Sequence, residues 1–291
     1  SNNDGCVIAR SEEAKALGYK MGDPFYQVKE KLEAEGVAIF SSNYTLYGSL
    51  SNRVMSMLSH YSPHIDQYSI DESFFDVDQS MAERFFQDNL KENDTFLNNE
   101  SLLHQYGAKI SADVLRAVGI PISIGIAETK TLAKIGSKFA KKYKGYQGVC
   151  MIDTDEKRRK ALQLFDLSDV WGIGRQTLEK LNYYGIHTPL DFADKSESWV
   201  KSHLTKPGVQ TWLELNGKPC IDTSEVMRKK TICTSRSFGE MVGNLDSLKS
   251  AVANFASSCA NKLRGDDSGA KKVTVFLSSN RFREDLEQYG N

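Results

Sequence analysis

Residues 68–77 read YSIDESFFDV, a run in which two acids, Asp71 and Glu72, stand among apolar and aromatic side chains. Tyr, Ile, Phe and Val in this density are typical of a β-strand. Neighbouring side chains on a strand point to opposite faces, so we expect one of the two acids to face the buried side. A buried carboxylate is costly unless its charge is compensated. The stretch therefore predicts a partner for this charge.

Two interpretations of the acidic pair remain open. In the first, Asp71 and Glu72 lie in a hairpin turn or on a surface strand edge, where acidic residues are common. In the second, they form a site for divalent cations. Mg²⁺ prefers oxygen ligands, usually one or two carboxylates together with substrate phosphates, and two cations about 4 Å apart serve phosphoryl transfer. The second interpretation requires a third acid from elsewhere in the chain.

The composition sets outer limits on function. The 291 residues predict about two domains, at roughly 150 residues each. With 37 basic and 38 acidic residues the net charge is −1, so any nucleic-acid contact must depend on local patches. Five scattered cysteines without a CxxC pair indicate a reducing compartment. No apolar run approaches the ~20 residues of a membrane-spanning helix, and we expect a cytoplasmic protein.

The hydrophobic pattern predicts an α+β, multidomain fold in which a sheet is covered by helices. Strands are expected at 6–9, 37–43, 68–77, 121–127 and 271–279. Helices are expected at 12–18, 25–36, 44–61, 110–119, 129–143, 156–165, 175–185, 190–195, 198–204 and 245–265. We interpret the polar residues 79–105 as an insertion or a frayed helix start.

A lysine stripe is predicted on the helix at 129–143. It consists of Lys130, Lys134, Lys138 and Lys141, which recur every three or four residues and so share one helix face. Residues 127–150 contain six lysines and one glutamate. A solvated surface face is one interpretation. Exposed helices usually mix both signs of charge, however, so the nearly uniform sign favours a phosphate partner.

A glycine-rich element follows, DVWGIGRQTLEKLNYYGI, at residues 169–186. Gly172, Ile173 and Gly174 precede a helix start, where backbone N–H groups and the helix dipole favour an anion. A helix–hairpin–helix holds a DNA backbone in this way without reading bases. The alternative is an ordinary pair of helices with glycine at the caps. Near the N-terminus, Arg10 and Lys15 lie at a strand-to-helix turn where they could hold a triphosphate.

Along the chain, a turn with Arg10 and Lys15, an acidic pair, a lysine helix and a helix–hairpin–helix follow one another. This order resembles that of Y-family translesion DNA polymerases, most closely the UmuC-type catalytic subunit of bacterial DNA polymerase V. The resemblance is carried by YSIDESFFDV, GIAETKTLAKIGSKFAKK, DVWGIGRQTLEKL and CTSRSFGE, among other stretches. It extends over nearly the whole chain apart from about 79–105.

The resemblance implies a right-handed polymerase that carries out error-prone translesion synthesis in DNA repair and the SOS response. It divides the chain into fingers (1–37), palm (38–153), thumb with a helix–hairpin–helix (154–224), linker (225–231) and part of the little finger (232–291). Asp71 and Glu72 would be the catalytic carboxylates that hold two Mg²⁺ ions. Arg10, Lys15 and Lys141 would bind the triphosphate.

The resemblance also implies substrates and partners. The substrates are primer–template DNA, contacted by Gly172, Ile173, Gly174, Lys134 and Lys138, and deoxynucleoside triphosphates. The partners are a UmuD-type dimer, a recombinase filament and a sliding clamp, with no membrane.

The two ends of the chain suggest a fragment, because it begins SNNDGCVIARS and ends EDLEQYGN. In the family, the first metal-binding Asp lies on a strand before this starting point, so we expect the chain by itself to be inactive or nearly so. A competing hypothesis is a non-catalytic DNA-binding protein that uses the helix–hairpin–helix and the lysines. A palm-like nucleotide cyclase is disfavoured, because it explains neither Gly172–Gly174 nor the units after residue 225.

Overall fold

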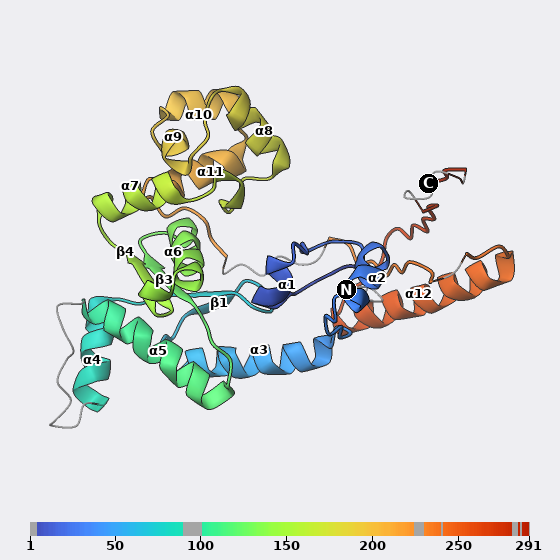
Figure 1. The fold of residues 1–291 in the computed structure, drawn as a ribbon, viewed down its shortest axis with the longest axis horizontal. Coiled ribbons are helices and arrows are strands. Elements are labelled where there is room, and N and C mark those ends of the chain that lie inside the picture. The colour runs from blue at the N-terminus through green and yellow to red at the C-terminus, as the bar shows by residue number, and fades with distance from the viewer. Residues whose placement is uncertain are drawn as a thin grey trace. The chain divides into compact units, whose positions relative to one another are not determined.

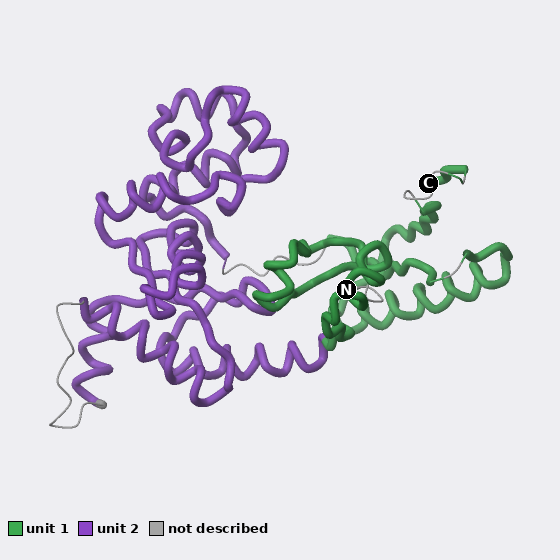
Figure 2. Tube along the Cα trace, viewed as in Figure 1, with its two compact units in different colours: residues 1–43, 227–291 green, residues 44–226 purple. Residues whose placement is uncertain are grey.

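The computed structural model of the chain describes residues 5–89, 101–223, 230–239, 241–280, 285 and 287–290. It divides into two units, one of residues 1–43 with 227–291 and one of residues 44–226 (Figure 2). The second unit takes in most of the predicted palm interval (38–153) and the whole predicted thumb interval (154–224). The expected α+β class is confirmed, and the finer domain boundaries stay predictions.

In the unit formed by residues 1–43 and 227–291, the regular secondary structure of the described residues is helical, apart from two isolated bridges. Its helices are α1 (Glu12–Ala16), α2 (Phe25–Ala34) and α12 (Leu245–Gly265), all predicted. The strand predicted at 6–9 is reduced to a bridge between Cys6 and Pro24, and those predicted at 37–43 and 271–279 are wrong. A strand needs a hydrogen-bonded neighbour, and for 271–279 the described residues supply only a bridge from Ser278 to Gly290.

Two small sheets lie in the unit of residues 44–226. Strands β1 (Ile65–Gln67) and β2 (Ser73–Phe75) form an antiparallel hairpin. The single strand predicted over 68–77 is therefore wrong: Tyr68 and Ser69 both donate their backbone N–H to the carbonyl of Glu72, at 3.0 Å each, and the chain reverses there. Strands β3 (Ile124–Ala127) and β4 (Val149–Ile152) pair in parallel, which requires a crossover connection between them.

That crossover is α6 (Lys130–Lys142), followed by the 3₁₀ turn η2 (Lys144–Tyr146). Figure 1 shows α6 beside β3 and β4, with α5 on one side of this layer and the helices α7–α11 on the other. The helix predicted at 129–143 is thus confirmed. The strand β4 was not predicted, because its four residues VCMI are too few to show a period.

One hydrophobic core of this unit joins α3 (Tyr44–Leu58), α4 (Gln79–Asn89) and α5 (Leu102–Val118) to β3 and β4. The face predicted for α3 is buried only near its C-terminal end, at Leu58, whereas Tyr47 is exposed. The polar stretch after residue 79 begins with a full helix, and residues 90–100 lie outside the described part. Helix α5 starts at Leu102, earlier than predicted, because the Ser101 side chain accepts a hydrogen bond from the backbone N–H of His104.

The second core joins α6 and β4 to the helices that follow. These are α7 (Asp155–Leu164), the 3₁₀ turn η3 (Leu167–Asp169), α8 (Arg175–Tyr183), α9 (Pro189–Ala193), α10 (Glu197–His203) and α11 (Lys206–Leu215). Their fully buried side chains include Leu162, Leu181, Ile186, Phe192, Val200 and Leu215. The helices α7 to α10 were predicted, whereas η3 and α11 were not. Helix α11 was missed because it begins with the residues KPG, and proline and glycine are usually signs of a loop. Proline is nevertheless well accommodated in the first turn of a helix.

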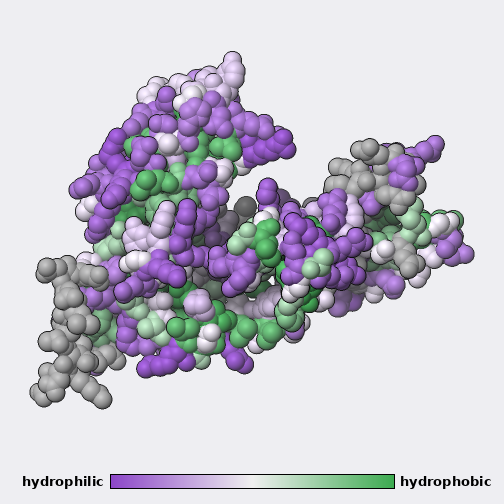
Figure 3. All heavy atoms as spheres, viewed as in Figure 1, coloured by the Kyte–Doolittle hydropathy of each residue, from purple (hydrophilic) through white to green (hydrophobic). Residues whose placement is uncertain are grey.

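The visible face of the molecule is largely hydrophilic (Figure 3). In Figure 3 hydrophilic side chains cover much of the visible face, and apolar residues form patches among them. Within the described residues, no helix combines the length and the apolar content needed to cross a bilayer.

Helix α6 and strand β3 meet at two glycines, Gly125 and Gly136. A Cβ on Gly125 would lie 1.9 Å from the carbonyl oxygen of Ala133 and 2.4 Å from the backbone nitrogen of Ser137. A Cβ on Gly136 would lie 3.2 Å from the Cα of Gly125. Backbone atoms cannot move aside as a side-chain tip can, so the position of α6 depends on these missing side chains.

We expect Gly125→Ala to reduce the free energy of unfolding by about 1–3 kcal/mol or more, because it overpacks the α6–β3 contact. Urea denaturation followed by circular dichroism measures this change. Gly48→Ala is the matched control, since Gly48 lies in α3 with open space around its Cα. It should stabilise the chain by about 0.5–1 kcal/mol through helix propensity. Equal effects of the two substitutions would contradict the steric argument.

A buried carboxylate, Asp113 of α5, links α3's end to α5. It accepts hydrogen bonds from the Tyr61 hydroxyl at 2.5 Å, from Lys109, and from Arg116 at 3.0 Å. Burial raises the pKa of Asp113, but the hydrogen bonds from Lys109 and Tyr61 outweigh it and hold that pKa below its ordinary value. Burial and the hydrogen bond to Asp113 raise the pKa of Tyr61.

The lowered pKa of Asp113 predicts a pH dependence of stability. The contribution of this carboxylate is complete above the unfolded-state pKa of 3.8 and is lost as the pH falls through the lower folded-state pKa. Asp113→Asn should cost about 1–3 kcal/mol at pH 7, and this difference from the unsubstituted protein should shrink below pH 3.8. Urea midpoints measured from pH 7 to pH 2.5 test it; a constant difference over that range (about 4.5 pH units) would contradict the role of Asp113.

Candidate functional site: a carboxylate pair, a lysine helix and a glycine turn

The acidic pair lies at the tip of the β1–β2 hairpin, where both side chains are exposed. One oxygen of Asp71 accepts a hydrogen bond from the Ser69 hydroxyl at 2.7 Å. The expectation that one acid faces the buried side is wrong, because the pair belongs to the turn and not to a continuous strand. The desolvation cost inferred from the sequence therefore does not arise, and both carboxylates are open to ligands from solvent.

Glu72 is held by Lys134 of α6. The Lys134 Nζ lies 2.6 Å from the Glu72 Oε1, and the lysine side chain is only 18% exposed. Three rings surround the same ammonium group, with centroids at 5.1 Å (Tyr68), 5.4 Å (Trp171) and 5.9 Å (Phe74). We call these five residues the lysine box. Carboxylate and ring faces both attract a cation, so the box ties the hairpin to α6 and to the segment before the glycine turn.

Two further lysines of the stripe are also paired within the chain. Lys130 contacts Asp66 of β1 at 3.1 Å and the Thr223 hydroxyl at 2.7 Å, and Lys138 contacts Asp169 at 3.3 Å. The stripe predicted from local sequence is thus largely balanced by acids that lie far away in the sequence. Lys141 is the exception: it is exposed and makes no such contact within the part of the chain that the structure describes.

Helix α6 is fixed at its N-terminus by Glu214 of α11, which is 1% exposed. One carboxylate oxygen of Glu214 accepts the backbone N–H of Thr131 at 2.9 Å, and the other accepts those of Cys220 at 2.9 Å and Ile221 at 3.1 Å. A carboxylate at this end of a helix is favoured by the helix dipole. No sign of this role is visible in the sequence, because a glutamate in a segment such as LELNG is usually expected at an exposed helix position.

The glycine turn consists of Gly172, Ile173 and Gly174. Gly172 has φ +93°, and a Cβ there would lie 2.1 Å from the hydroxyl oxygen of Thr211. Gly174 is the N-cap of α8 and has no side chain, so the backbone N–H groups of the first turn lack a capping acceptor from the N-cap residue. Ile173 is buried, which leaves the two glycines at the surface. The geometry matches an anion-binding helix start.

Arg10 and Lys15 belong to the unit of residues 1–43 and 227–291, and each is engaged locally. Arg10 donates from Nη1 to the carbonyl of Tyr19 at 3.1 Å, while its buried Nε has no hydrogen-bond partner among the described residues. Lys15 pairs with Glu12 at 2.5 Å. The exposed Lys15 pair is weak and can open to another anion.

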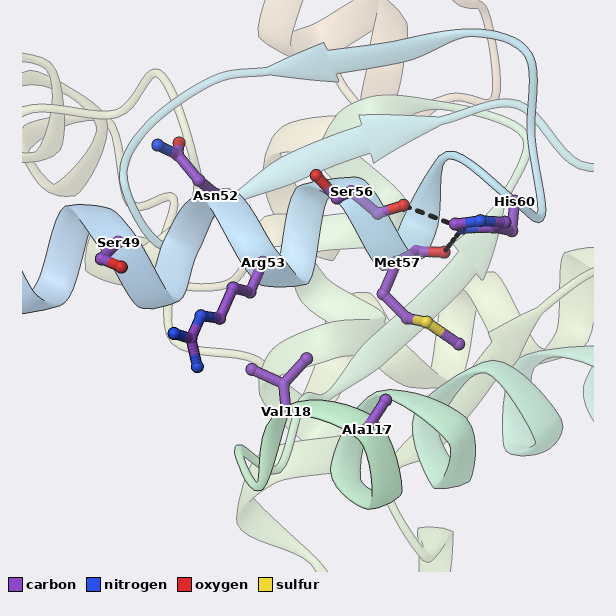
Figure 4. Close-up of a pocket in the computed structure, with 8 residues that line it drawn as sticks. All are labelled: Ser49, Asn52, Arg53, Ser56, Met57, His60, Ala117 and Val118. Carbon is purple, nitrogen blue, oxygen red and sulfur yellow. Dashed lines mark hydrogen bonds between the residues drawn. The ribbon is translucent and has the colours of Figure 1, made fainter.

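A separate cavity of about 500 Å³ lies between α3 and the C-terminal end of α5 (Figure 4). In it the ring of His60 contacts the backbone carbonyls of Ser56 and Met57, at 2.9 and 3.2 Å. None of the residues predicted from the sequence lines this cavity. Its lining residues are Ser49, Asn52, Arg53, Ser56, Met57, His60, Ala117 and Val118.

The donor set at the hairpin tip fits a hard divalent cation. Asp71 and Glu72 offer carboxylate oxygens, which Mg²⁺ prefers, and such sites commonly add phosphate oxygens from a substrate. Across the described residues, no three His, Cys, Asp or Glu side chains gather into a metal-binding cluster. The two acids thus form the acidic part of a site, and the third acid required by the sequence argument is not brought to them by any described residue.

Comparison with known proteins gives a consistent picture. The sequence profile of the impB/mucB/samB family matches residues 1–138, and that of the family's C-terminal domain matches residues 229–290. Protein UmuC of Salmonella typhimurium is 38% identical over 293 residues, which cover the whole of this chain and 65% of that protein. Protein ImpB of Salmonella typhimurium is 37% identical, with the same coverage. The chain therefore spans about two thirds of the length of these relatives.

A solved structure shares the fold. A Y-family DNA polymerase chimera of Dbh and Dpo4 superposes with a TM-score of 0.67 at 20% identity, covering 98% of this chain and 78% of that one. The likeness covers residues of both units and supports the α+β fold class expected from the sequence.

The lysine box predicts unequal roles for two lysines of α6. Lys134→Met should reduce the free energy of unfolding by about 1–2 kcal/mol, because it removes a partly buried cation that contacts a carboxylate and three aromatic rings. Lys138→Met, the matched control, removes a more exposed pair and should cost less than about 1 kcal/mol. Urea denaturation compares them. A Lys138 effect equal to or larger than that of Lys134 would overturn the assignment.

Proposed function

Because the chain belongs to the impB/mucB/samB family, we propose that it carries the catalytic palm of a Y-family translesion DNA polymerase. The reaction is template-directed nucleotidyl transfer, in which the primer 3′-hydroxyl attacks the α-phosphate of a deoxynucleoside triphosphate and pyrophosphate leaves. The observation that supports this most directly is the pair of open carboxylates, Asp71 and Glu72, held at a hairpin tip by a helix of lysines.

In this proposal Asp71 and Glu72 are the residues that hold divalent cations. Bound there, such cations would lower the cost of deprotonating the primer hydroxyl and stabilise the leaving pyrophosphate. Lys134 fixes the direction of the Glu72 carboxylate through its 2.6 Å contact. Asp71 remains free to turn toward a ligand, since its described contact is a single hydrogen bond from Ser69.

The proposed triphosphate contacts are Lys141, which is unpaired among the described residues, together with Arg10 and Lys15, which have local partners. Lys141, exposed near the end of α6, is the group best placed on this helix to take a triphosphate oxygen. Arg10 and Lys15, in the other unit, are also proposed as triphosphate ligands, and the buried Nε of Arg10, which has no hydrogen-bond partner among the described residues, is suited to an anionic acceptor.

DNA contacts are assigned to the glycine turn. The uncapped N–H groups at the start of α8 bind a backbone phosphate without reading bases. Lys134 and Lys138, which also entered the prediction, are committed to Glu72 and Asp169 in this structure. They act on DNA only if those pairs open. The family also suggests a cytoplasmic location. It suggests as partners a UmuD-type dimer, a recombinase filament and a sliding clamp.

Primer extension by the protein as naturally expressed tests the proposal. Asp71→Asn and Glu72→Gln should each reduce extension with Mg²⁺ by at least about 10³-fold, because cation-held charge stabilisation supplies several kcal/mol of the barrier reduction. Binding to primer–template DNA should change by less than about threefold, since the glycine turn is untouched.

Asp76→Asn is the control, because Asp76 is an exposed acid of the same segment beyond β2. It should leave extension near that of the unsubstituted protein. Full extension by either of the first two variants would remove the catalytic assignment. DNA binding without extension by the unsubstituted protein would favour the alternative of a non-catalytic DNA-binding protein.

A further inference from the structure

A cluster of aromatic side chains lies on the surface at the far end of α8 from the glycine turn. The thumb platform, as we name it, consists of Tyr183, Tyr184, Trp199 and His203 with the cations Lys180 and Lys195. Tyr183 ends α8, and Trp199 and His203 lie one helical turn apart on α10. At 1.5 Å per residue, the tyrosines lie about 13 Å along α8 from Gly174. The platform is therefore distinct from the proposed phosphate site of the same helix.

The rings form a continuous assembly. Trp199 and His203 stack with centroids 4.3 Å apart and an interplanar angle of 13°. Tyr184 meets their edges, at 5.4 Å from Trp199 and 4.7 Å from His203. Tyr183 extends the assembly outward, at 5.2 Å from Tyr184. Three of the rings are thus locked by each other, and the fourth projects from them.

Exposure separates the platform from the core beneath it. Tyr183 is 83% exposed, whereas Leu181, two residues earlier, is fully buried. The Tyr183 ring therefore contributes almost nothing to the packing of this unit. Large exposed aromatic rings are characteristic of binding surfaces, where they supply contact area at a low entropic cost.

The charges around the rings are uneven. Nearby acids are already paired: Glu197 with Lys201 at 2.6 Å, and Asp194 with Arg159 at 2.9 Å. Lys195 lies 5.7 Å from the centroid of the Trp199 ring, and Lys180 donates to the backbone carbonyl of His203. Neither of these two lysines has a carboxylate partner among the described residues. The platform thus presents aromatic faces beside uncompensated positive charge.

We propose that the thumb platform binds single-stranded DNA. Bases stack on exposed aromatic faces irrespective of sequence, and lysines beside the rings take the backbone phosphates. A partner with only aliphatic contacts would leave Lys180 and Lys195 without an anion. Single-stranded DNA offers bases for the rings and phosphates for the lysines. The C-terminal end of α8 carries partial negative charge, which disfavours a phosphate beside Tyr183. In the proposal a base therefore stacks on Tyr183 and a phosphate contacts Lys195. This site is additional to the proposed polymerase site and does not depend on catalysis.

Fluorescence anisotropy with a labelled oligothymidylate of about ten nucleotides tests the proposal, a length within the usual range for one single-strand-binding module. An excess of unlabelled blunt duplex occupies the proposed duplex-binding surface, so the remaining signal reports the platform. Tyr183→Ala should weaken this binding by at least about fivefold, the loss of one stacked base, while Tyr183→Phe keeps it. The high exposure of Tyr183 makes misfolding of the variant a minor concern, and its circular dichroism should be unchanged.

Two matched controls sharpen the result. Tyr44→Ala removes another exposed tyrosine of the same unit and should not change oligothymidylate binding. Lys195→Ala should lower the salt dependence by about 0.7 in log–log slope, as expected for one phosphate on a single strand. Lys201→Ala, a lysine already paired with Glu197, should change it less.

Equal binding by Tyr183→Ala and the unsubstituted protein would overturn the proposal. So would the absence of oligothymidylate binding under saturating duplex, which would turn attention to a protein partner for the platform. Loss of binding in both Tyr183→Ala and Tyr183→Phe would also count against it, because stacking does not need the hydroxyl.

Discussion

The closeness of α6 to β3 is the constraint on which the rest of the larger unit depends. Gly125 and Gly136 let the two backbones touch, and at this distance no side chain fits between them. The helix then packs into one core, since its Leu132, Ile135 and Phe139 are buried with the helices that follow β4. The strands serve the other core through Ile124 and Val149. The opposite face of α6 is left for the lysines. A helix set further out would carry the same lysines away from the acids that pair with them.

Two of the carboxylates that contact α6 differ in their surroundings. Glu214 is buried, and three backbone N–H groups satisfy it, so it fixes the start of α6. Glu72 is half-exposed, and Lys134 with its ring neighbours holds it at the hairpin tip. The first is structural because its oxygens are fully occupied. The second retains an oxygen that is free to meet a cation or a substrate, which is what a catalytic carboxylate requires.

In the helical region from α7 to α11, both ends of α8 are exposed. The start of α8 offers backbone N–H groups, and its end carries the aromatic platform. Backbone N–H groups suit a phosphate whatever the base, and rings suit a base whatever its sequence. If the chain acts as the proposed translesion polymerase, contacts of both kinds suit irregular templates, because neither demands a particular base.

The sequence by itself determined most of the helices and the resemblance to Y-family polymerases, and it proposed Asp71, Glu72 and Gly172–Gly174 as site residues. These signals are local: an apolar period, a glycine pair or adjacent acids can be read within a few residues. Only the tertiary structure showed that YSIDESFFDV is a reversal, because a turn is set by the hydrogen bonds that Glu72 accepts across it. It also decided which lysines are free. Lys134 meets Glu72, Lys130 meets Asp66, and Glu214 meets Thr131 across long stretches of chain, and such pairs depend on packing that no local pattern contains.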